Sequence, residues 1–235
     1  MLCKISDLIV EIPEAGGMAP RCRDYLWNKN DGADIIIRTD LLRPEAMPGA
    51  SEELVEYLQT GTYFYIQLLK FSGMMLHSSA VEADGKAYLF SGDCGAGKST
   101  HTRLWQTVFG EKAQVFNDDK PALRLIDGRW YAYGTPWCGK DGINQNRKVP
   151  LAGICFLKKA GENKIRRLSA AEALPRIIRQ TQHKFYKPET THRMLALVEE
   201  LVSQIPVFEL ENRPEPEAAW LSYETMKLAA EECNL

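Results

Sequence analysis

Apolar and polar positions follow a strand-like pattern at the start of the chain. The short β-branched runs Leu8-Ile9-Val10 and Ile35-Ile36-Ile37 are separated by polar and glycine-containing stretches. Runs of this kind, bounded by turn residues, are typical of short strands. Residues 1–50 are therefore expected to form a small β-rich segment, and residues 51–235 the main domain.

A helix is expected where this segment ends. Ser51 is a favourable N-cap residue, and Glu52 and Glu53 follow it, where carboxylates suit the positive end of the helix dipole. The helical pattern continues past Gly61, a candidate break, and Gly73 is a plausible stop.

The middle of the chain alternates strands with tight turns, and the last third is mostly helical. Asp84-Gly85 and Asp127-Gly128 are turn dipeptides that favour hairpins. Strands are predicted over residues 74–81, 87–91, 113–116, 122–126, 130–133, 151–157, 165–168 and 207–210. Helices are predicted over residues 98–109, 170–182, 188–204 and 215–232. The fold class is therefore an α/β domain with a mixed sheet and a helical C-terminus.

Composition narrows the class of protein. The net charge is −2, with 45% hydrophobic and 26% charged residues, so no general electrostatic argument favours nucleic acid or an anionic membrane as a partner. No apolar run approaches the roughly 20 residues that span a bilayer. The N-terminus has no signal-peptide pattern, and the six cysteines are dispersed, as expected of reduced thiols. A cytoplasmic location is expected.

The most informative motif is a glycine-rich loop between a predicted strand and a predicted helix. Residues 92–99 read Gly-Asp-Cys-Gly-Ala-Gly-Lys-Ser and match the P-loop pattern G-x-x-x-x-G-K-[ST]. In such loops backbone N–H groups surround the phosphates, here joined by the helix dipole. Lys98 is expected on the β- and γ-phosphates and the Ser99 hydroxyl on magnesium. ATP and Mg²⁺ are the expected cofactors, bound by Gly92, Asp93, Cys94, Gly95, Ala96, Gly97, Lys98, Ser99 and Thr100.

Carboxylates and a histidine accompany the loop. Asn117-Asp118-Asp119 closes a short apolar strand downstream. Carboxylates there suit magnesium or proton transfer, although Asn-Asp-Asp also suits a simple turn. His77 is predicted to lie in an apolar strand next to the strand that precedes the loop. His101, His183 and His192 lack metal-ligand spacing and are assigned no role.

These three features, in this order, resemble the catalytic core of the HPr serine kinase/phosphorylase family and its short stand-alone relatives, over about residues 70–135. The resemblance implies the P-loop fold shared with phosphoenolpyruvate carboxykinase. It also implies Asp118 as the base on a serine-like hydroxyl and Asp119 as a magnesium ligand. His77 and Lys98 would complete the catalytic set, with His77 holding the transferred phosphate or the base. A homo-oligomer is left open.

Residues 134–148 are the expected acceptor-facing loop. The segment is polar and glycine-rich, and Trp137, Lys140 and Arg147 are the candidate acceptor-site residues. A positive charge there would neutralise charge that develops on the transferred phosphoryl group. The alternative is a surface loop with Trp137 in the core.

The predicted function is an ATP- and magnesium-dependent kinase that phosphorylates a hydroxyl of a protein, peptide or small molecule. Two alternatives remain at this point. One is a carboxykinase-like or nucleotide-hydrolysing enzyme, and the other is a nucleotide-binding regulatory module without turnover. Retention of a base beside the loop argues against the last.

Overall fold

A nine-stranded mixed sheet forms the centre of the computed structural model, which describes residues 1–14, 16–29, 31–38, 40, 42–181 and 187–235. The strand order along its main path is β4-β8-β9-β10-β6-β5-β7, and β12 pairs with both β10 and β11. The strands are β4 (Gly73–Met75), β5 (Ser78–Ala83), β6 (Lys86–Ser91), β7 (Ala113–Asp119), β8 (Ala122–Ile126), β9 (Arg129–Tyr133), β10 (Lys148–Lys159), β11 (Lys164–Arg167) and β12 (Val207–Asn212).

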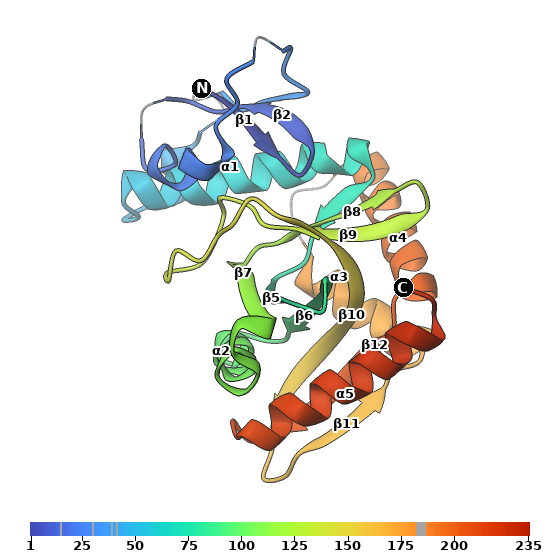
Figure 1. The fold of residues 1–235 in the computed structure, drawn as a ribbon. Coiled ribbons are helices and arrows are strands. Elements are labelled where there is room, and N and C mark those ends of the chain that lie inside the picture. The colour runs from blue at the N-terminus through green and yellow to red at the C-terminus, as the bar shows by residue number, and fades with distance from the viewer. Residues whose placement is uncertain (15, 30, 39, 41, 182–186) are drawn as a thin grey trace.

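The long strand β10 joins the two parts of this sheet, and Figure 1 shows it curving through the molecule. Its first residues pair antiparallel with β9, and the rest runs parallel to β6 on one side and β12 on the other. Because β6, β10 and β12 are parallel, their carboxyl ends lie along the same edge of the sheet. The glycine-rich loop follows β6 at this edge.

Helices cover both faces of the sheet. One apolar core lies between the sheet and α3 (Ala170–Gln180) with α4 (Pro188–Gln204). A second core lies between the sheet and α2 (Lys98–Phe109) with α5 (Pro216–Glu232). Central strands buried on both faces are continuous apolar runs rather than alternating patterns, as in β10.

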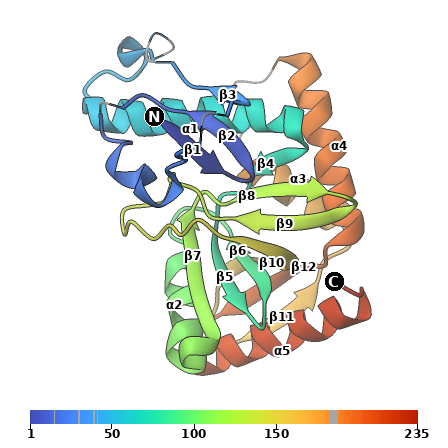
Figure 2. The same ribbon diagram turned by 45° about the horizontal axis from the view of Figure 1, so that its top comes forward.

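A smaller sheet packs on the remaining helix, α1 (Glu52–Leu68). It contains β1 (Leu2–Ile5), β2 (Leu8–Glu11) and β3 (Ile35–Ile36), in the order β1-β2-β3. Figure 2 shows this sheet beside α1, above the β8–β9 hairpin. A third apolar core contains residues of the small sheet, of α1 and of the hairpin. The N-terminal segment thus shares its core with elements of the main domain, and the predicted boundary at residue 50 stays a prediction.

Most of the predicted elements are present. Ser51 caps α1 by accepting a hydrogen bond from the Leu54 N–H, and α2 has the predicted bounds. The Asp84-Gly85 turn has φ values of 51° and 72°, as a tight hairpin requires. The helix predicted over residues 170–182 ends at Gln180, and Gln182 lies outside the described residues.

Two predictions were wrong. The strand predicted over residues 74–81 is interrupted at Leu76 and His77, because β4 pairs with β8 whereas β5 pairs with β6 and β7. Gly61 does not break α1. A Cβ atom there would lie 2.8 Å from the Trp137 ring, so the glycine allows close packing against that ring.

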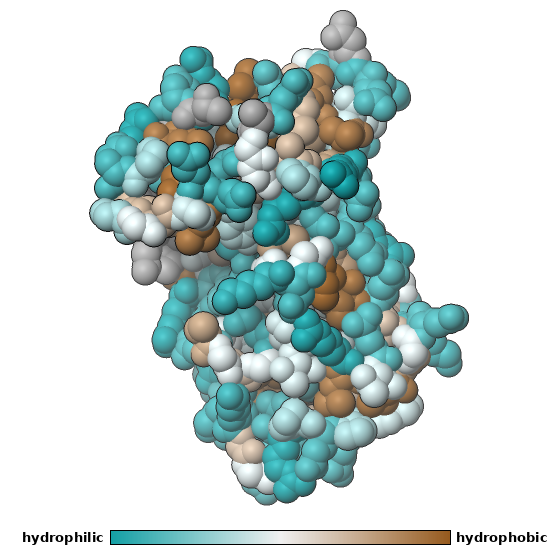
Figure 3. Space-filling view, turned by 90° about the vertical axis from the view of Figure 1, so that its left-hand side faces the viewer, coloured by the Kyte–Doolittle hydropathy of each residue, from teal (hydrophilic) through white to brown (hydrophobic). Residues whose placement is uncertain are grey.

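The surface in Figure 3 is largely hydrophilic, with apolar residues in separate small patches. Of the helices in the described ranges, none has the length and apolarity to span a membrane.

Candidate functional site

The glycine-rich loop lies between β6 and α2, at the edge where the parallel strands end. Gly92, Gly95 and Gly97 have φ values of 143°, 77° and 100°, a region that residues with a Cβ atom rarely adopt. Gly97 is the N-cap of α2. The loop therefore turns tightly into the N-terminus of a helix, an arrangement that favours anions.

Lys98 and Ser99 begin α2 and face the interior of the loop and the aspartate pair. The Lys98 Nζ atom donates hydrogen bonds to the carbonyl oxygens of Gly92 at 3.1 Å and Asp93 at 3.3 Å. Burial lowers the pKa of the Lys98 ammonium, although the nearby Asp119 carboxylate opposes this shift. The Ser99 hydroxyl donates to Asp118 Oδ1 at 3.1 Å.

Asp118 and Asp119 end β7, where their carboxylates have different partners. Asp119 Oδ1 lies 3.2 Å from His77 Nε2. Its other oxygen lies 2.6 Å from Lys120 Nζ and accepts a hydrogen bond from the Tyr57 hydroxyl at 3.1 Å. Burial acts to raise the pKa of Asp119, but the hydrogen bond from His77 and the Lys120 charge outweigh it, so this pKa lies well below its usual range.

The backbone at Asp119 is also unusual. Its φ is 93°, outside the regions that non-glycine residues favour. Such conformations persist where surrounding contacts hold them, and they concentrate at functional sites. Here the side chains of His77, Lys120 and Tyr57 hold the carboxylate in place.

The structure brings together five of the predicted site residues, namely His77, Lys98, Ser99, Asp118 and Asp119. His77 lies between β4 and β5, not inside a strand. His101 is buried on α2, with its Nε2 atom 3.0 Å from the Ser222 hydroxyl. It belongs to the α2–α5 core, and His183 lies outside the described residues.

The predicted acceptor loop contacts the aspartate pair through its backbone. The Gly139 N–H donates to the Asp118 carbonyl oxygen at 2.7 Å, and Cys138 forms an antiparallel bridge with Asp119. Lys140, directly after Gly139, is exposed. This part of the loop therefore lies directly against the aspartate pair.

Two acceptor candidates in this loop lie elsewhere. Trp137 is fully buried, stacks on Phe64 and donates to Thr60 Oγ1 at 3.1 Å. Arg147 pairs with Glu82 of β5 at 3.1 Å. Glu82 is in register with Gln114 of β7, which precedes Asp119 by five residues. Five residues span about 16 Å along a strand, so the Arg147 side chain lies outside the site, as does that of the buried Trp137.

Three residues in the site were not predicted. Tyr57 comes from α1, Lys120 directly follows the aspartate pair, and Gln180 ends α3. Gln180 Oε1 lies 3.0 Å from His77 Nδ1, and its amide nitrogen donates to Asp93 Oδ1 at 3.4 Å. Only Lys120 had a local signal, as a cation beside two carboxylates. Tyr57 and Gln180 reach the site through tertiary packing.

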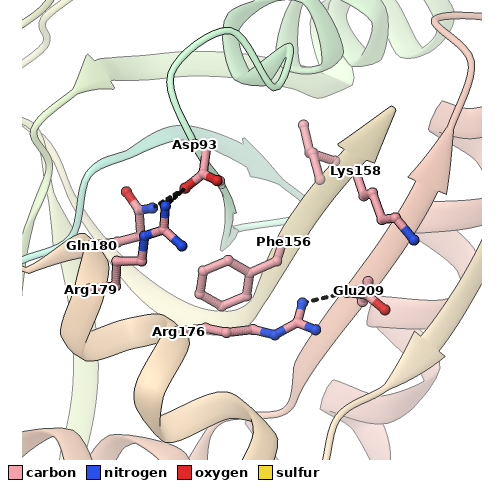
Figure 4. Close-up of a pocket in the computed structure, with 9 residues that line it drawn as sticks. Asp93, Phe156, Lys158, Arg176, Arg179, Gln180 and Glu209 are labelled. Atoms are coloured by element: carbon pink, nitrogen blue, oxygen red, sulfur yellow. Dashed lines mark hydrogen bonds and ion pairs between the residues drawn. The ribbon is translucent and has the colours of Figure 1, made fainter. Parts of the chain in front are cut away.

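A cavity adjoins each side of the glycine-rich loop. One, of about 240 Å³, is lined by Gly92, Asp93 and side chains of β10, β12 and α3. Figure 4 shows Arg179 and Gln180 directed at Asp93, and Arg176 paired with Glu209 beside the Phe156 ring. The other cavity, of about 430 Å³, is lined by residues 95–101 of the loop and α2, with Lys159, Asn212 and Pro214.

The oxygen atoms beside the loop suit a small hard cation. Mg²⁺ prefers oxygen ligands at about 2.0–2.1 Å in an octahedral arrangement, so two neighbouring ligands lie about 2.9 Å apart. The Ser99 and Asp118 oxygens are 3.1 Å apart. The described residues contain no cluster of three His, Cys, Asp or Glu side chains that could hold a metal. Magnesium would therefore need phosphate oxygens as further ligands, as is usual for this ion.

Comparison with known proteins gives a family and a distant likeness to solved structures. No curated protein matches the chain. Among solved structures, the HPr(Ser) kinase/phosphatase from Coxiella burnetii matches with a TM-score of 0.40 and 12% identity, over 68% of this chain and 94% of that chain. A similarity of this size carries no argument about function.

A family model also matches the chain over one continuous range. The profile of the family described as SynChlorMet cassette protein ScmC matches residues 46–213. This range contains α1, the glycine-rich loop, the aspartate pair and β12. Because the matched range exceeds half of the 235 residues, the chain belongs to the ScmC family.

Proposed function

We propose that this protein is an ATP- and magnesium-dependent phosphotransferase that moves the γ-phosphoryl group to a hydroxyl of a protein, peptide or small molecule. The observation that carries the proposal is the contact of Ser99 with Asp118 at 3.1 Å, beside Lys98 and in front of a glycine-rich loop. A loop hydroxyl paired with a strand-end aspartate is how P-loop enzymes hold magnesium on the β- and γ-phosphates.

The contacts favour roles for the two aspartates that are the reverse of those implied by the family resemblance. Asp118 accepts the Ser99 hydrogen bond, so we assign Asp118 to magnesium. An ionised carboxylate has about four lone-pair sites. Three sites of Asp119 face His77, Lys120 and Tyr57, which leaves one for an acceptor hydroxyl. We therefore assign Asp119 to the acceptor.

The reaction then needs little from the protein beyond positioning and charge. The acceptor oxygen forms a bond to the γ-phosphorus while the bond to the β,γ-bridging oxygen breaks, and the hydroxyl proton passes to Asp119. Because the transition state is loose, a carboxylate with a low pKa suffices as the proton acceptor. Lys98 and Lys120 supply positive charge near the group in transfer. Magnesium, when bound, would neutralise charge on the phosphate oxygens.

The test compares three variants with the parent protein. Titration calorimetry with ATP and magnesium measures binding, and release of inorganic phosphate measures slow transfer to water. Lys98→Ala should abolish detectable binding. Asp118→Asn should remove the magnesium dependence of binding. Asp119→Asn should keep binding but slow phosphate release by about 10²–10⁴-fold, the usual size of a general-base effect.

Each part of the proposal can fail separately. A parent protein that does not bind ATP with magnesium excludes the function altogether. Binding without any formation of ADP, in the presence or absence of added hydroxyl compounds, would favour a regulatory module, because ADP is released whether water or a hydroxyl takes the phosphoryl group. If Asp118→Asn slows release while binding keeps its magnesium dependence, the two aspartates have the roles that the resemblance implied.

A further inference from the structure

A residue that lines the cavity on the α2 side of the loop has a buried polar atom without a partner. Asn212, the last residue of β12, lines this cavity and is 8% exposed. Its side-chain Oδ1 atom has no hydrogen-bond donor among the residues that the structure describes. Leaving a buried acceptor unpaired is costly, and such groups in folded proteins call for an explanation.

The position of Asn212 in the sheet suggests what could satisfy it. Asn212 is in register with Lys159, at the carboxyl ends of the parallel strands β12 and β10. The glycine-rich loop leaves β6 at the same edge, and β6 is the other neighbour of β10. Ligands of open α/β sheets bind outside the carboxyl ends of their strands.

A nucleotide at the loop would extend toward this cavity. Its terminal phosphates belong near Lys98 and Ser99, which also line the cavity, and Thr100 continues the lining along α2. The rest of the molecule must then occupy space next to the loop. The cavity of about 430 Å³ lies there, with Lys159, Asn212 and Pro214 on its other side.

We propose that this cavity binds the adenine base of the nucleotide and that Asn212 selects it. The inference rests on the proposed function, since it takes the loop to hold the phosphates. The Asn212 side-chain oxygen has less than 1 Å² of accessible surface, so the amide turns toward the cavity when the base binds. There its one donor and one acceptor pair with N7 and the amino group of adenine. Guanine presents two acceptors at the corresponding edge, so its O6 atom would leave the Asn212 oxygen unpaired. Lys159, which is exposed, lies where it can contact the ribose or the α-phosphate.

The test is a comparison of ligands that share the triphosphate but differ in the base. Calorimetry at constant magnesium measures the affinity of the full chain for ATP, GTP and inorganic tripolyphosphate. The parent should bind ATP at least about tenfold more tightly than GTP. Asn212→Ala should weaken ATP by about 10- to 100-fold, the discrimination expected of one amide–base pair. The affinities for GTP and tripolyphosphate should change less than about twofold.

Two further variants make the outcome decisive. Asn212→Ser is a second replacement in case Asn212→Ala does not fold, as judged by circular dichroism. Asn28→Ala, at an exposed residue of the N-terminal segment, is the matched control and should change nothing. Equal affinity of the parent for ATP and GTP, or an Asn212→Ala protein that still prefers ATP, overturns the inference and leaves the phosphotransferase proposal intact. Absence of binding to all three ligands overturns both.

Discussion

His77 Nε2 lies 3.2 Å from Asp119 Oδ1, and the same ring contacts Gln180 Oε1 through Nδ1 at 3.0 Å. Gln180 in turn donates to Asp93 Oδ1 at 3.4 Å. A continuous set of hydrogen bonds therefore links the glycine-rich loop to the aspartate pair through the last residue of α3. His77 is held on both sides by groups from distant parts of the chain.

This arrangement predicts that Gln180 positions His77. Gln180→Leu should leave ATP affinity unchanged but slow phosphate release by about tenfold, the effect of losing one hydrogen bond next to a charged pair. Long-range ¹H–¹⁵N NMR of the His77 ring should show an altered Nδ1 signal. Arg179→Ala is the control, because Arg179 contacts the same Asp93 Oδ1 atom at 3.1 Å and so tests the contact with the loop separately from the contact with His77. An unchanged ring spectrum in Gln180→Leu would contradict the assignment.

A second prediction concerns Lys140 in the acceptor loop. Lys140 is exposed and follows Gly139, whose N–H bonds to the Asp118 carbonyl. Lys140→Ala should slow transfer to an acceptor more than it weakens ATP binding, because a positive charge at this end of the loop would stabilise the charge that develops on the transferred group. Single-turnover kinetics with a hydroxyl acceptor measures this. Arg147→Ala, remote from the aspartates, should leave transfer unaffected, and equal rates in Lys140→Ala and the parent would remove Lys140 from the site.

A third prediction concerns the close contact of α1 with Trp137. Alanine normally stabilises a helix relative to glycine by about 1 kcal/mol. At Gly61, however, a Cβ atom would lie 2.8 Å from the Trp137 Cδ1 atom. Gly61→Ala should therefore destabilise the protein, by about 1–3 kcal/mol for an overpacked core. Urea unfolding provides the measurement, and Gly161→Ala, with open space around it, is the control. A Gly61→Ala protein more stable than the parent would show that the contact relaxes freely.

A fourth prediction is a pH dependence of stability caused by His101. Burial lowers the pKa of the His101 imidazole from 6.5 to about 4. Because the pKa of His101 is lower in the folded state than in the unfolded state, the neutral imidazole contributes fully to stability above the unfolded value of 6.5. This contribution is lost as pH falls toward about 4, because in that range only the unfolded state takes up the proton. One pKa unit corresponds to 1.36 kcal/mol, so the loss between pH 7 and pH 5 is about 2 kcal/mol.

His101→Gln should remove this part of the decline. Urea unfolding at pH 7 and pH 5 should show a decrease in the free energy of unfolding about 2 kcal/mol smaller in His101→Gln than in the parent. His192→Gln, at an exposed residue of α4, should keep the decline of the parent. If His101→Gln and the parent lose stability equally, other groups cause the pH dependence.

The sequence alone determined the local features of this protein. The Ser51 cap, the bounds of α2 and the Asp84-Gly85 turn follow from interactions between residues close in the chain, whose preferences are readable from residue type and spacing. The glycine-rich loop belongs to the same group, because its glycines, its lysine and the helix after it are consecutive. The sequence also placed Asp118 and Asp119 at the end of a strand, where β7 has them.

The tertiary structure decided which side chains meet in the site. The interruption at His77 arises because β4 and β5 pair with different strands, a choice that no local pattern encodes. Tyr57, Gln180 and Asn212 come from α1, α3 and β12. Only the tertiary arrangement of these elements brings Tyr57 to Asp119, Gln180 to Asp93 and Asn212 to the cavity beside the loop. Trp137 lies in the core and not in the predicted acceptor site, because Gly61 leaves room for its ring against α1. A large aromatic ring is more stable when it is buried in the core than when it is exposed to water in a polar loop.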